Sequence, residues 1–223
     1  MLYSHKNYLF VFLLILTSLP IKSEQNPFLF IDNNAQDMVK VLTNESSLFD
    51  TNRKLYEQKI KDIFEPMIDF RRVAASVMGK KYYLMASQEQ RNEFILIFKD
   101  SLLETYAETL AQWGESTIST DFPKDYFLSK KFENYEKNIE VKQTLDTGTS
   151  KYPISYKLRK SDNGWKIVNI IINGVNLGLT FRNQFQALAV SQNENIEATL
   201  INWVSDACLL YTSDAADEWR SGV

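Results

Sequence analysis

The sequence contains one histidine and one cysteine among its 223 residues. The histidine, His5, lies in an N-terminal segment that we expect to be removed, which leaves the mature chain without an imidazole. Serine and cysteine hydrolases that use a histidine base are therefore excluded, and so are the usual zinc sites. No GxGxxG, P-loop or HExxH motif is present. We expect no metal and no cofactor, while carboxylate or Tyr/Lys acid–base chemistry stays open.

Glycine and proline are also scarce, with seven and five residues, and this argues against disorder and low complexity. The formal net charge of -3 and the lack of a basic stripe give no sign of a nucleic-acid partner. The single cysteine, Cys208, cannot form an internal disulfide, so the fold must depend on its hydrophobic core. The chain is long enough for one domain with a sizeable core.

The first 23 residues have the layout of a secretory signal peptide. His5 and Lys6 precede an apolar run, Tyr8 to Leu19, and Pro20 follows it. The run is shorter than the roughly 20 residues that span a bilayer. The alternative is an uncleaved N-terminal anchor; a lipoprotein anchor is not expected, because no Cys follows the cleavage region. An exported chain without disulfides fits the bacterial periplasm.

Apolar residues at helical spacing predict most of the N-terminal half to be helical. Ser87 and Gln90 form a capping box at the start of the strongest of these helices. Two further helices are expected near the C-terminus. The predicted helices cover residues 32–42, 55–68, 69–78 (ending at Gly79), 87–113, 179–191 and 196–204.

Between these two helical regions the apolar period changes to two, which predicts strands. Turn sequences at 146–149 and 161–164 join the last three strands, so we expect an antiparallel meander. The predicted strands cover residues 126–135, 139–146, 152–158 and 165–173. The order of elements predicts an α+β fold in which helices cover one face of a curved sheet.

The last segment, 206–223, has no clear period and contains Cys208. We interpret it as a non-native or disordered tail derived from a frame shift, a vector or an assembly error. The alternative is a genuine variable terminus.

Three stretches of the sequence resemble one protein family. Residues 69–79 (DFRRVAASVMG) are similar to its DF-x-R-x-A…VLG segment, and residues 87–107 to its EQR-x-x-F…TYA helix. Residues 164–185 are similar to its GWKV-x-D…EGVSL…YR-x-QF ending. In this order and spacing they resemble the MlaC family of periplasmic phospholipid-binding proteins, also called the Ttg2D or toluene-tolerance auxiliary family. The resemblance covers about residues 30–204.

Three positions depart from the pattern of that family. Asn169 stands where Asp is frequent, Asn173 where Glu is frequent, and Phe181 where Tyr is common. We expect the lost charges to affect surface or partner contacts more than the fold.

The resemblance implies an NTF2-like curved sheet with a helical subdomain, which together enclose an apolar lipid cavity. It places the helical part at about 24–114, and the sheet with the C-terminal helices at about 115–205. It implies a non-enzymatic periplasmic carrier, expected as a monomer, that shuttles diacyl phospholipid and so maintains outer-membrane lipid asymmetry. Its implied partners are an inner-membrane ABC transporter with an MCE-domain subunit and an outer-membrane lipoprotein–porin complex.

The candidate lipid-lining residues are apolar or aromatic and come from the strand faces and the helices. They are Phe70, Val73, Phe94, Phe98, Leu102, Tyr106, Tyr152, Ile154, Tyr156, Trp165, Ile167, Val175, Phe181 and Phe185. The alternative for each is a plain core residue, since an aromatic stripe on an amphipathic helix is usually core. Arg71, Arg72 and Arg182 are candidates for headgroup or partner contact, or else solvated or salt-bridged surface arginines.

Two other functions stay open at this point. An NTF2-like enzyme acting on a small apolar substrate would need a buried carboxylate with a raised pKa, such as Asp69 or Asp146, beside a Tyr. A protein-interaction module would have a filled core and no ligand.

Overall fold

The computed structural model describes residues 26–111, 116–124 and 137–203, with no description of the side chains of residues 105–111. Its helices are α1 (Pro27–Asn44), α2 (Ser47–Thr51), α3 (Arg53–Phe64), α4 (Phe70–Met85), α5 (Gln88–Ala111) and α6 (Leu177–Ser191). A short 3-10 helix, η1 (Glu65–Met67), follows α3, and residues 196–203 are also helical. None of the described helices is both long and apolar enough to cross a membrane.

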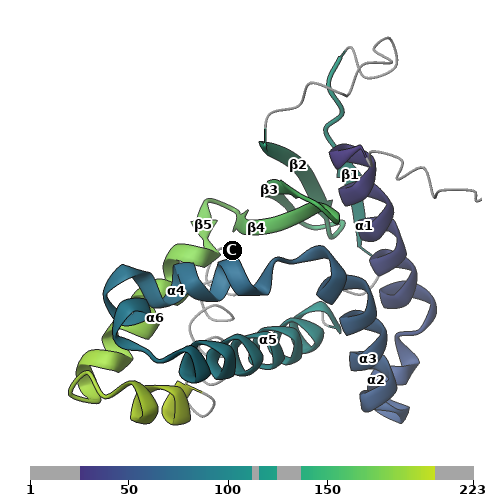
Figure 1. Cartoon of the computed structure of the whole chain (residues 1–223). Helices are drawn as coiled ribbons and strands as arrows, with labels where there is room; N and C mark the ends of the chain where they lie inside the picture. Colours follow the sequence, from purple (N-terminus) through teal and green to yellow (C-terminus); the bar gives the residue numbers. More distant parts are fainter. Residues whose placement is uncertain (1–25, 112–115, 125–136, 204–223) are drawn as a thin grey trace, which may run out of the picture.

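One antiparallel sheet runs through the molecule in the order β1-β2-β3-β4-β5 (Figure 1). Its strands are β1 (Thr117–Thr120), β2 (Asn138–Asp146), β3 (Lys151–Ser161), β4 (Gly164–Ile172) and β5 (Val175–Asn176). Because neighbours in sequence are neighbours in the sheet, the predicted meander is confirmed. Gly164, with a φ of 98°, closes the β3–β4 hairpin.

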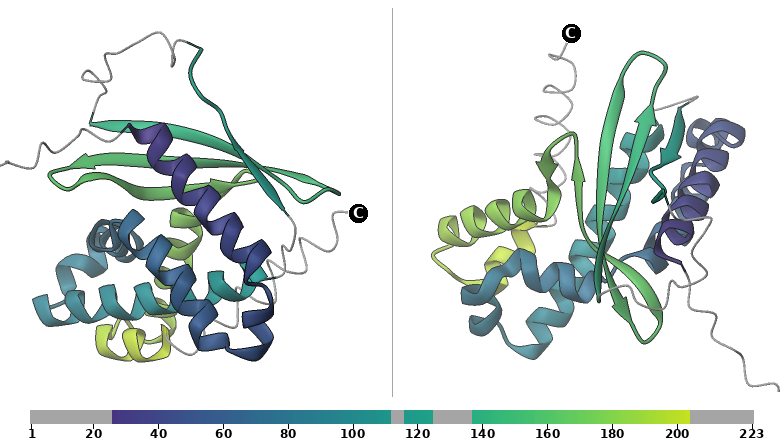
Figure 2. Two further views of the ribbon diagram at one scale, coloured as in Figure 1. Left: turned by 90° about the vertical axis from the view of Figure 1, so that its right-hand side faces the viewer. Right: turned by 90° about the horizontal axis from the view of Figure 1, so that it is seen from above.

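The helices gather on one face of this curved sheet, as Figures 1 and 2 show. On β3 the side chains of Ile154, Tyr156 and Leu158 are buried toward the helices, whereas Lys157 lies on the other face and pairs with Glu140. Helices α4 and α6 pack against β4, α5 packs against α3 and α4, and α1 packs against β1 and β2. The predicted α+β class with helices on one sheet face is thus confirmed.

A β-bulge interrupts the pairing of β3 with β4 between Lys157 and Leu158. Leu158 pairs with Ile167, but Tyr156 pairs with Ile170, so one extra residue stands in β4. Strict alternation along β4 therefore predicts the wrong inward residues beyond Ile167, because a bulge shifts the alternation by one.

Helix α3 ends at Phe64, four residues before the predicted end at 68. Pro66 lacks an N–H and restricts the residue before it, so the chain turns through η1 instead of continuing as α-helix. Ile68 then forms a bridge to Ile167, and the Asp69 N–H donates to the Ile167 carbonyl at 3.0 Å. These contacts fix the entry to α4 against the sheet.

Gly79 ends the first helical stretch of α4, as the sequence predicted. Its φ of 69° interrupts the helical backbone, but residues 80–85 resume the helix after the kink. The positive φ favours glycine at this position, and a Cβ there would lie 3.1 Å from the Arg182 guanidinium, a close contact that Arg182 would have to relieve. The kink brings α4 close to α6.

The predicted capping box is present at the start of α5. The Ser87 N–H donates to Gln90 Oε1 at 2.9 Å, and the Gln90 N–H donates to Ser87 Oγ at 3.2 Å. Helix α2 and strands β1 and β5 were not predicted, because each is too short for a clear period. The predicted strand 126–135, the signal peptide and the segment 206–223 lie outside the described residues.

Candidate functional site

A hollow lies between the inner face of the sheet and helices α4, α5 and α6. It encloses an empty volume of about 800 Å³, part of which is open to solvent. Its lining comes from the end of α3 and η1, from the three helices, and from β3 and β4. The lining residues are Phe64, Ile68, Val73, Phe98, Leu102, Leu103, Ile154, Tyr156, Ile167, Asn169, Ile170, Ile172, Leu177, Gly178 and Phe181. We call this hollow the main pocket.

The main pocket is apolar because β3 and β4 supply branched and aromatic side chains to it and the helices supply Leu, Val and Phe. Its lining among the described residues includes no Asp, Glu, Lys, Arg or His. A lining of this apolar character is typical of sites that bind a ligand through its nonpolar surface.

Tyr156 and Asn169 are the side chains that bring polar atoms to this lining. Burial raises the pKa of Tyr156, so its phenol stays neutral at physiological pH. Both polar atoms of the Asn169 amide have a partner: Nδ2 donates to Asn176 Oδ1 at 2.9 Å, and Oδ1 accepts from the Gly178 N–H at 3.0 Å. The pocket therefore offers almost no charge or free polarity to a ligand.

Asn169 and Asn176 together fix the start of α6 at the edge of the main pocket. Asn176 is the N-cap of α6, because its side chain also accepts from the Leu179 N–H at 3.1 Å. Asn169 holds this cap from β4. We expected the change at position 169 to affect surface or partner contacts. In the structure Asn169 instead joins the sheet to α6, the helix that closes the pocket.

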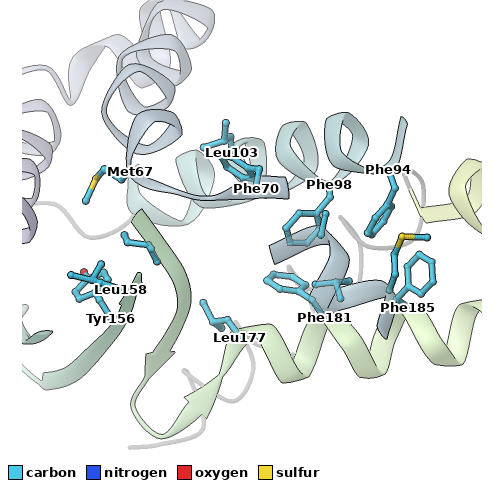
Figure 3. Close-up of a cluster of buried hydrophobic side chains, with 14 of the residues drawn as sticks. Met67, Phe70, Phe94, Phe98, Leu103, Tyr156, Leu158, Leu177, Phe181 and Phe185 are labelled. Atoms are coloured by element: carbon cyan, nitrogen blue, oxygen red, sulfur yellow. The ribbon is translucent and has the colours of Figure 1, made fainter. Parts of the chain in front are cut away.

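A cluster of aromatic rings forms one end of the main pocket (Figure 3). Phe98 of α5 and Phe181 of α6 face each other edge to face, with ring centroids 5.4 Å apart. Behind them Phe94 packs edge to face against Phe185, at 4.9 Å, and against Trp203, at 5.6 Å. The first pair lines the pocket, and the rings behind it are fully buried support.

The structure brings part of the predicted lining set together around the main pocket. These residues are Val73, Phe98, Leu102, Ile154, Tyr156, Ile167 and Phe181. Phe70, Phe94, Trp165 and Phe185 are buried in the core instead, and Tyr152 is half-buried against it. Val175 is 47% exposed on β5 and does not line the pocket. The side chain of Tyr106 lies outside the described residues.

Sequence reasoning missed several lining residues for identifiable reasons. Ile170 and Ile172 were missed because the one-residue bulge brings them to the inner face of β4, where strict alternation from Ile167 would place Ile171 instead. Phe64 and Ile68 fell within a predicted helix, with no signal that the chain turns there toward the sheet. Leu177 and Gly178 enter the lining because Asn169 draws the first turn of α6 toward β4.

The three arginines lie apart from the lining. Arg71 is exposed on α4 and borders a small cleft together with Arg91. Arg72 forms an ion pair with Asp69, with Nε and Oδ2 3.2 Å apart. Arg182 is half-buried beside Gly79, and its Nε finds no hydrogen-bond partner among the described residues.

Neither Asp69 nor Asp146 is the buried catalytic carboxylate that the enzyme alternative needs. Asp69 accepts from the Arg72 N–H at 3.0 Å as the N-cap of α4, and it is outside the lining. The Gly148 N–H and the Lys151 ammonium lower the pKa of Asp146, whereas an acid–base role needs a raised pKa. Within the described ranges, no group of three His, Cys, Asp or Glu residues could hold a metal ion.

Comparisons with known proteins agree with this architecture. The sequence model of a family described as MlaC protein matches residues 32–204. The toluene tolerance protein ttg2D of Pseudomonas putida is 24% identical over 196 residues, which span 87% of this chain and 88% of that protein. The intermembrane phospholipid transport system binding protein MlaC of Haemophilus influenzae is 20% identical over 184 residues, which span 82% and 75%.

A solved structure has the same fold. It is the phospholipid-binding protein from Ralstonia solanacearum, in complex with a phospholipid. The two superpose with a TM-score of 0.70 at 21% sequence identity, covering 85% of this chain and all of that one.

Proposed function

The chain belongs to the MlaC protein family, and from this premise we propose that it is a phospholipid carrier that covers the acyl chains of its cargo in the main pocket. The observation that carries the proposal is the uncharged apolar lining between the sheet and helices α4 to α6. The names of two relatives and the bound phospholipid of the structural neighbour support it.

The physical need for such a pocket follows from the cargo. Two acyl chains contain on the order of 30 methylenes, and exposing them to water costs roughly 24 kcal/mol at about 0.8 kcal/mol each. A phospholipid therefore crosses an aqueous compartment only when its chains stay covered. Phe98, Leu102 and Ile170 offer them a surface without an unpaired polar group.

No covalent step is required of the carrier. Burial in the pocket replaces burial in a membrane, so transfer in either direction is close to thermoneutral. The direction of transport is set by the partners, for example by an ATPase at one end of the path. Neither Asp69 nor Asp146 lines the main pocket, as the enzyme alternative would need, and a module with a filled core would not contain an open apolar pocket.

We place the carrier in the periplasm, after removal of residues 1–23 as a signal peptide. There it would shuttle phospholipid between an outer-membrane lipoprotein–porin complex and an inner-membrane ABC transporter with an MCE-domain subunit, and so maintain outer-membrane lipid asymmetry. The N-terminal layout of the sequence and the transport-system name of one relative support this assignment.

The proposed binding domain is residues 24–205, and 206–223 is the proposed non-native or disordered tail. Lipid contact is assigned first to the predicted residues that line the main pocket. Phe94 and Phe185 would act as support behind them. Headgroup or partner contact is assigned to Arg71, Arg72 and Arg182, which lie outside the apolar lining.

A vesicle assay tests the proposal. The full chain is mixed with donor vesicles that contain a fluorescent phosphatidylglycerol and with unlabelled acceptor vesicles, and transfer is followed over time. We expect transfer to accelerate in proportion to protein concentration. A rate that equals spontaneous exchange at every protein concentration would contradict the carrier function.

A further inference from the structure

A second apolar pocket lies beside the main one, between α1 and the β1–β3 side of the same sheet face. Its empty volume is about 520 Å³, again partly open to solvent. Ile31, Met38 and Leu42 of α1 line it together with Leu145 of β2. Its lining, like that of the main pocket, includes no ionised side chain among the described residues.

The two pockets share three lining residues: Phe64, Ile154 and Tyr156. Because they line both pockets, these three side chains stand between them, and we call them the wall. Figure 3 shows Tyr156 with Leu158 on the sheet, away from the aromatic cluster of Phe98 and Phe181.

The wall is held in place from two directions. Ile154 and Tyr156 lie in β3, which is paired along both edges, to β2 and to β4, and both side chains are buried. Phe64 is the last residue of α3, immediately before η1. The ion pair of Lys99 with Glu65, at 2.9 Å, and a hydrogen bond from Lys166 to the Pro66 carbonyl fix that turn.

We propose that this wall, and Tyr156 above all, limits the acyl-chain length that the carrier accepts, with the chains ending at Tyr156 and the second pocket closed off behind it. The inference rests on the proposed function, and it names a residue that determines lipid selectivity.

The selectivity for chain length follows from a difference between the membrane and the pocket of the carrier. A membrane buries every methylene whatever the chain length, whereas the carrier buries only those that fit before the wall. Each methylene left in water lowers loading by a factor of about 4, which is roughly 0.8 kcal/mol. A carrier with a fixed wall therefore takes the shorter of two lipids from a mixed vesicle.

The test is competitive loading of the full chain. Vesicles contain equal amounts of dimyristoleoyl and dioleoyl phosphatidylcholine, which differ only in chain length, and native mass spectrometry gives the ratio of the two lipids on the protein. We expect the wild type to favour the shorter lipid, and Tyr156→Val, which joins the pockets, to reduce that preference about fourfold or more. Tyr152→Val is the matched control, because Tyr152 lies on the same face of β3 but lines neither pocket. It should keep the wild-type ratio.

Equal loading of both lipids by the wild type, or an unchanged ratio in Tyr156→Val, would overturn the proposal that the wall limits chain length. The carrier function would remain supported. Absence of lipid from all three proteins would overturn the carrier function and the wall together.

If Tyr156→Val does not fold, the wild type alone decides. A phosphatidylcholine with a diazirine at the end of one palmitoyl-length chain is photolysed on the protein. Because the chains end at the wall, we expect crosslinks to Tyr156, Ile154 or Phe64. Crosslinks to the Met38 or Leu42 region of α1 would contradict a closed wall.

Discussion

The amide oxygen of Asn169 accepts a hydrogen bond from the Gly178 N–H at 3.0 Å, and it lies 2.6 Å from the position that a Cβ on Gly178 would occupy. No side chain fits there without displacing Asn169. Because Asn169 also holds the N-cap of α6 through Asn176, this contact determines how the helix meets β4 at the edge of the main pocket.

Gly178→Ala should therefore destabilise the protein by about 1–3 kcal/mol, the usual effect of overpacking. Urea unfolding of wild type and variant measures the loss. In an Asn169→Ala background the clash is gone, so the same substitution should have a clearly smaller effect. An equal loss in both backgrounds would show that the contact with Asn169 is not the cause.

Asp69 has a structural role at the start of α4, and its removal should affect stability alone. Asp69→Ala deletes the bond to the Arg72 N–H and should lower the free energy of unfolding by about 1 kcal/mol. Asp69→Asn keeps the cap and loses only a surface ion pair, so it should stay within about 1 kcal/mol of wild type. Lipid content, measured by mass spectrometry, should not change in either variant. A loss of bound lipid in Asp69→Asn would contradict this assignment.

Tyr156 should make the protein sensitive to alkaline pH. Its pKa is raised in the fold by burial, so its contribution to stability is complete below the unfolded pKa of about 10 and is lost as the pH rises above that value. Tyr156→Phe removes the ionisable phenol, so the unfolding free energy of this variant should fall less steeply with pH than that of the wild type. Tyr56, whose pKa burial also raises, contributes equally to both proteins. Parallel stability curves between about pH 9 and pH 11 would contradict the buried neutral phenol.

A carboxylate in the main pocket should prevent lipid binding. Leu102→Asp places a charge against the acyl chains and should reduce retained lipid at least about tenfold, because an unpaired charge is costly to bury. Leu96→Asp is the matched control, since Leu96 lies on the same helix but is 58% exposed and lines no described pocket. Circular dichroism confirms that both variants fold. Equal lipid retention in the two variants would place the lipid elsewhere.

Much of the fold could be predicted because apolar residues recur at regular intervals along its helices and strands. Residues 139–146 and 152–158 alternate cleanly, and the observed strands β2 and β3 contain both ranges. The capping box at Ser87 fixed the start of α5 to within one residue. Local patterns of this kind are decided by neighbours in sequence, and they survive tertiary packing.

The rest depends on contacts between distant residues. The bulge beside Leu158 places Ile170 on the pocket face of the sheet. The alternation of apolar residues in the sequence does not reveal this bulge. Gly79 ends a helical stretch as its residue type predicts, but the sequence does not reveal that the helix resumes at residue 80 or that Gly79 approaches Arg182. Phe94 and Phe98 lie on the same apolar stripe of α5, but only Phe98 lines the pocket. Phe94 is a core residue because α6 and Trp203 cover it.

The central claim is that the main pocket holds phospholipid, and native mass spectrometry tests it most directly. The full chain, residues 1–223, is expressed in a Gram-negative host and purified from the periplasmic fraction without detergent. Its mass is measured before and after lipid extraction. We predict one diacyl phospholipid per chain, lost on extraction and regained from liposomes. A ligand-free mass that persists after incubation with liposomes would contradict the account.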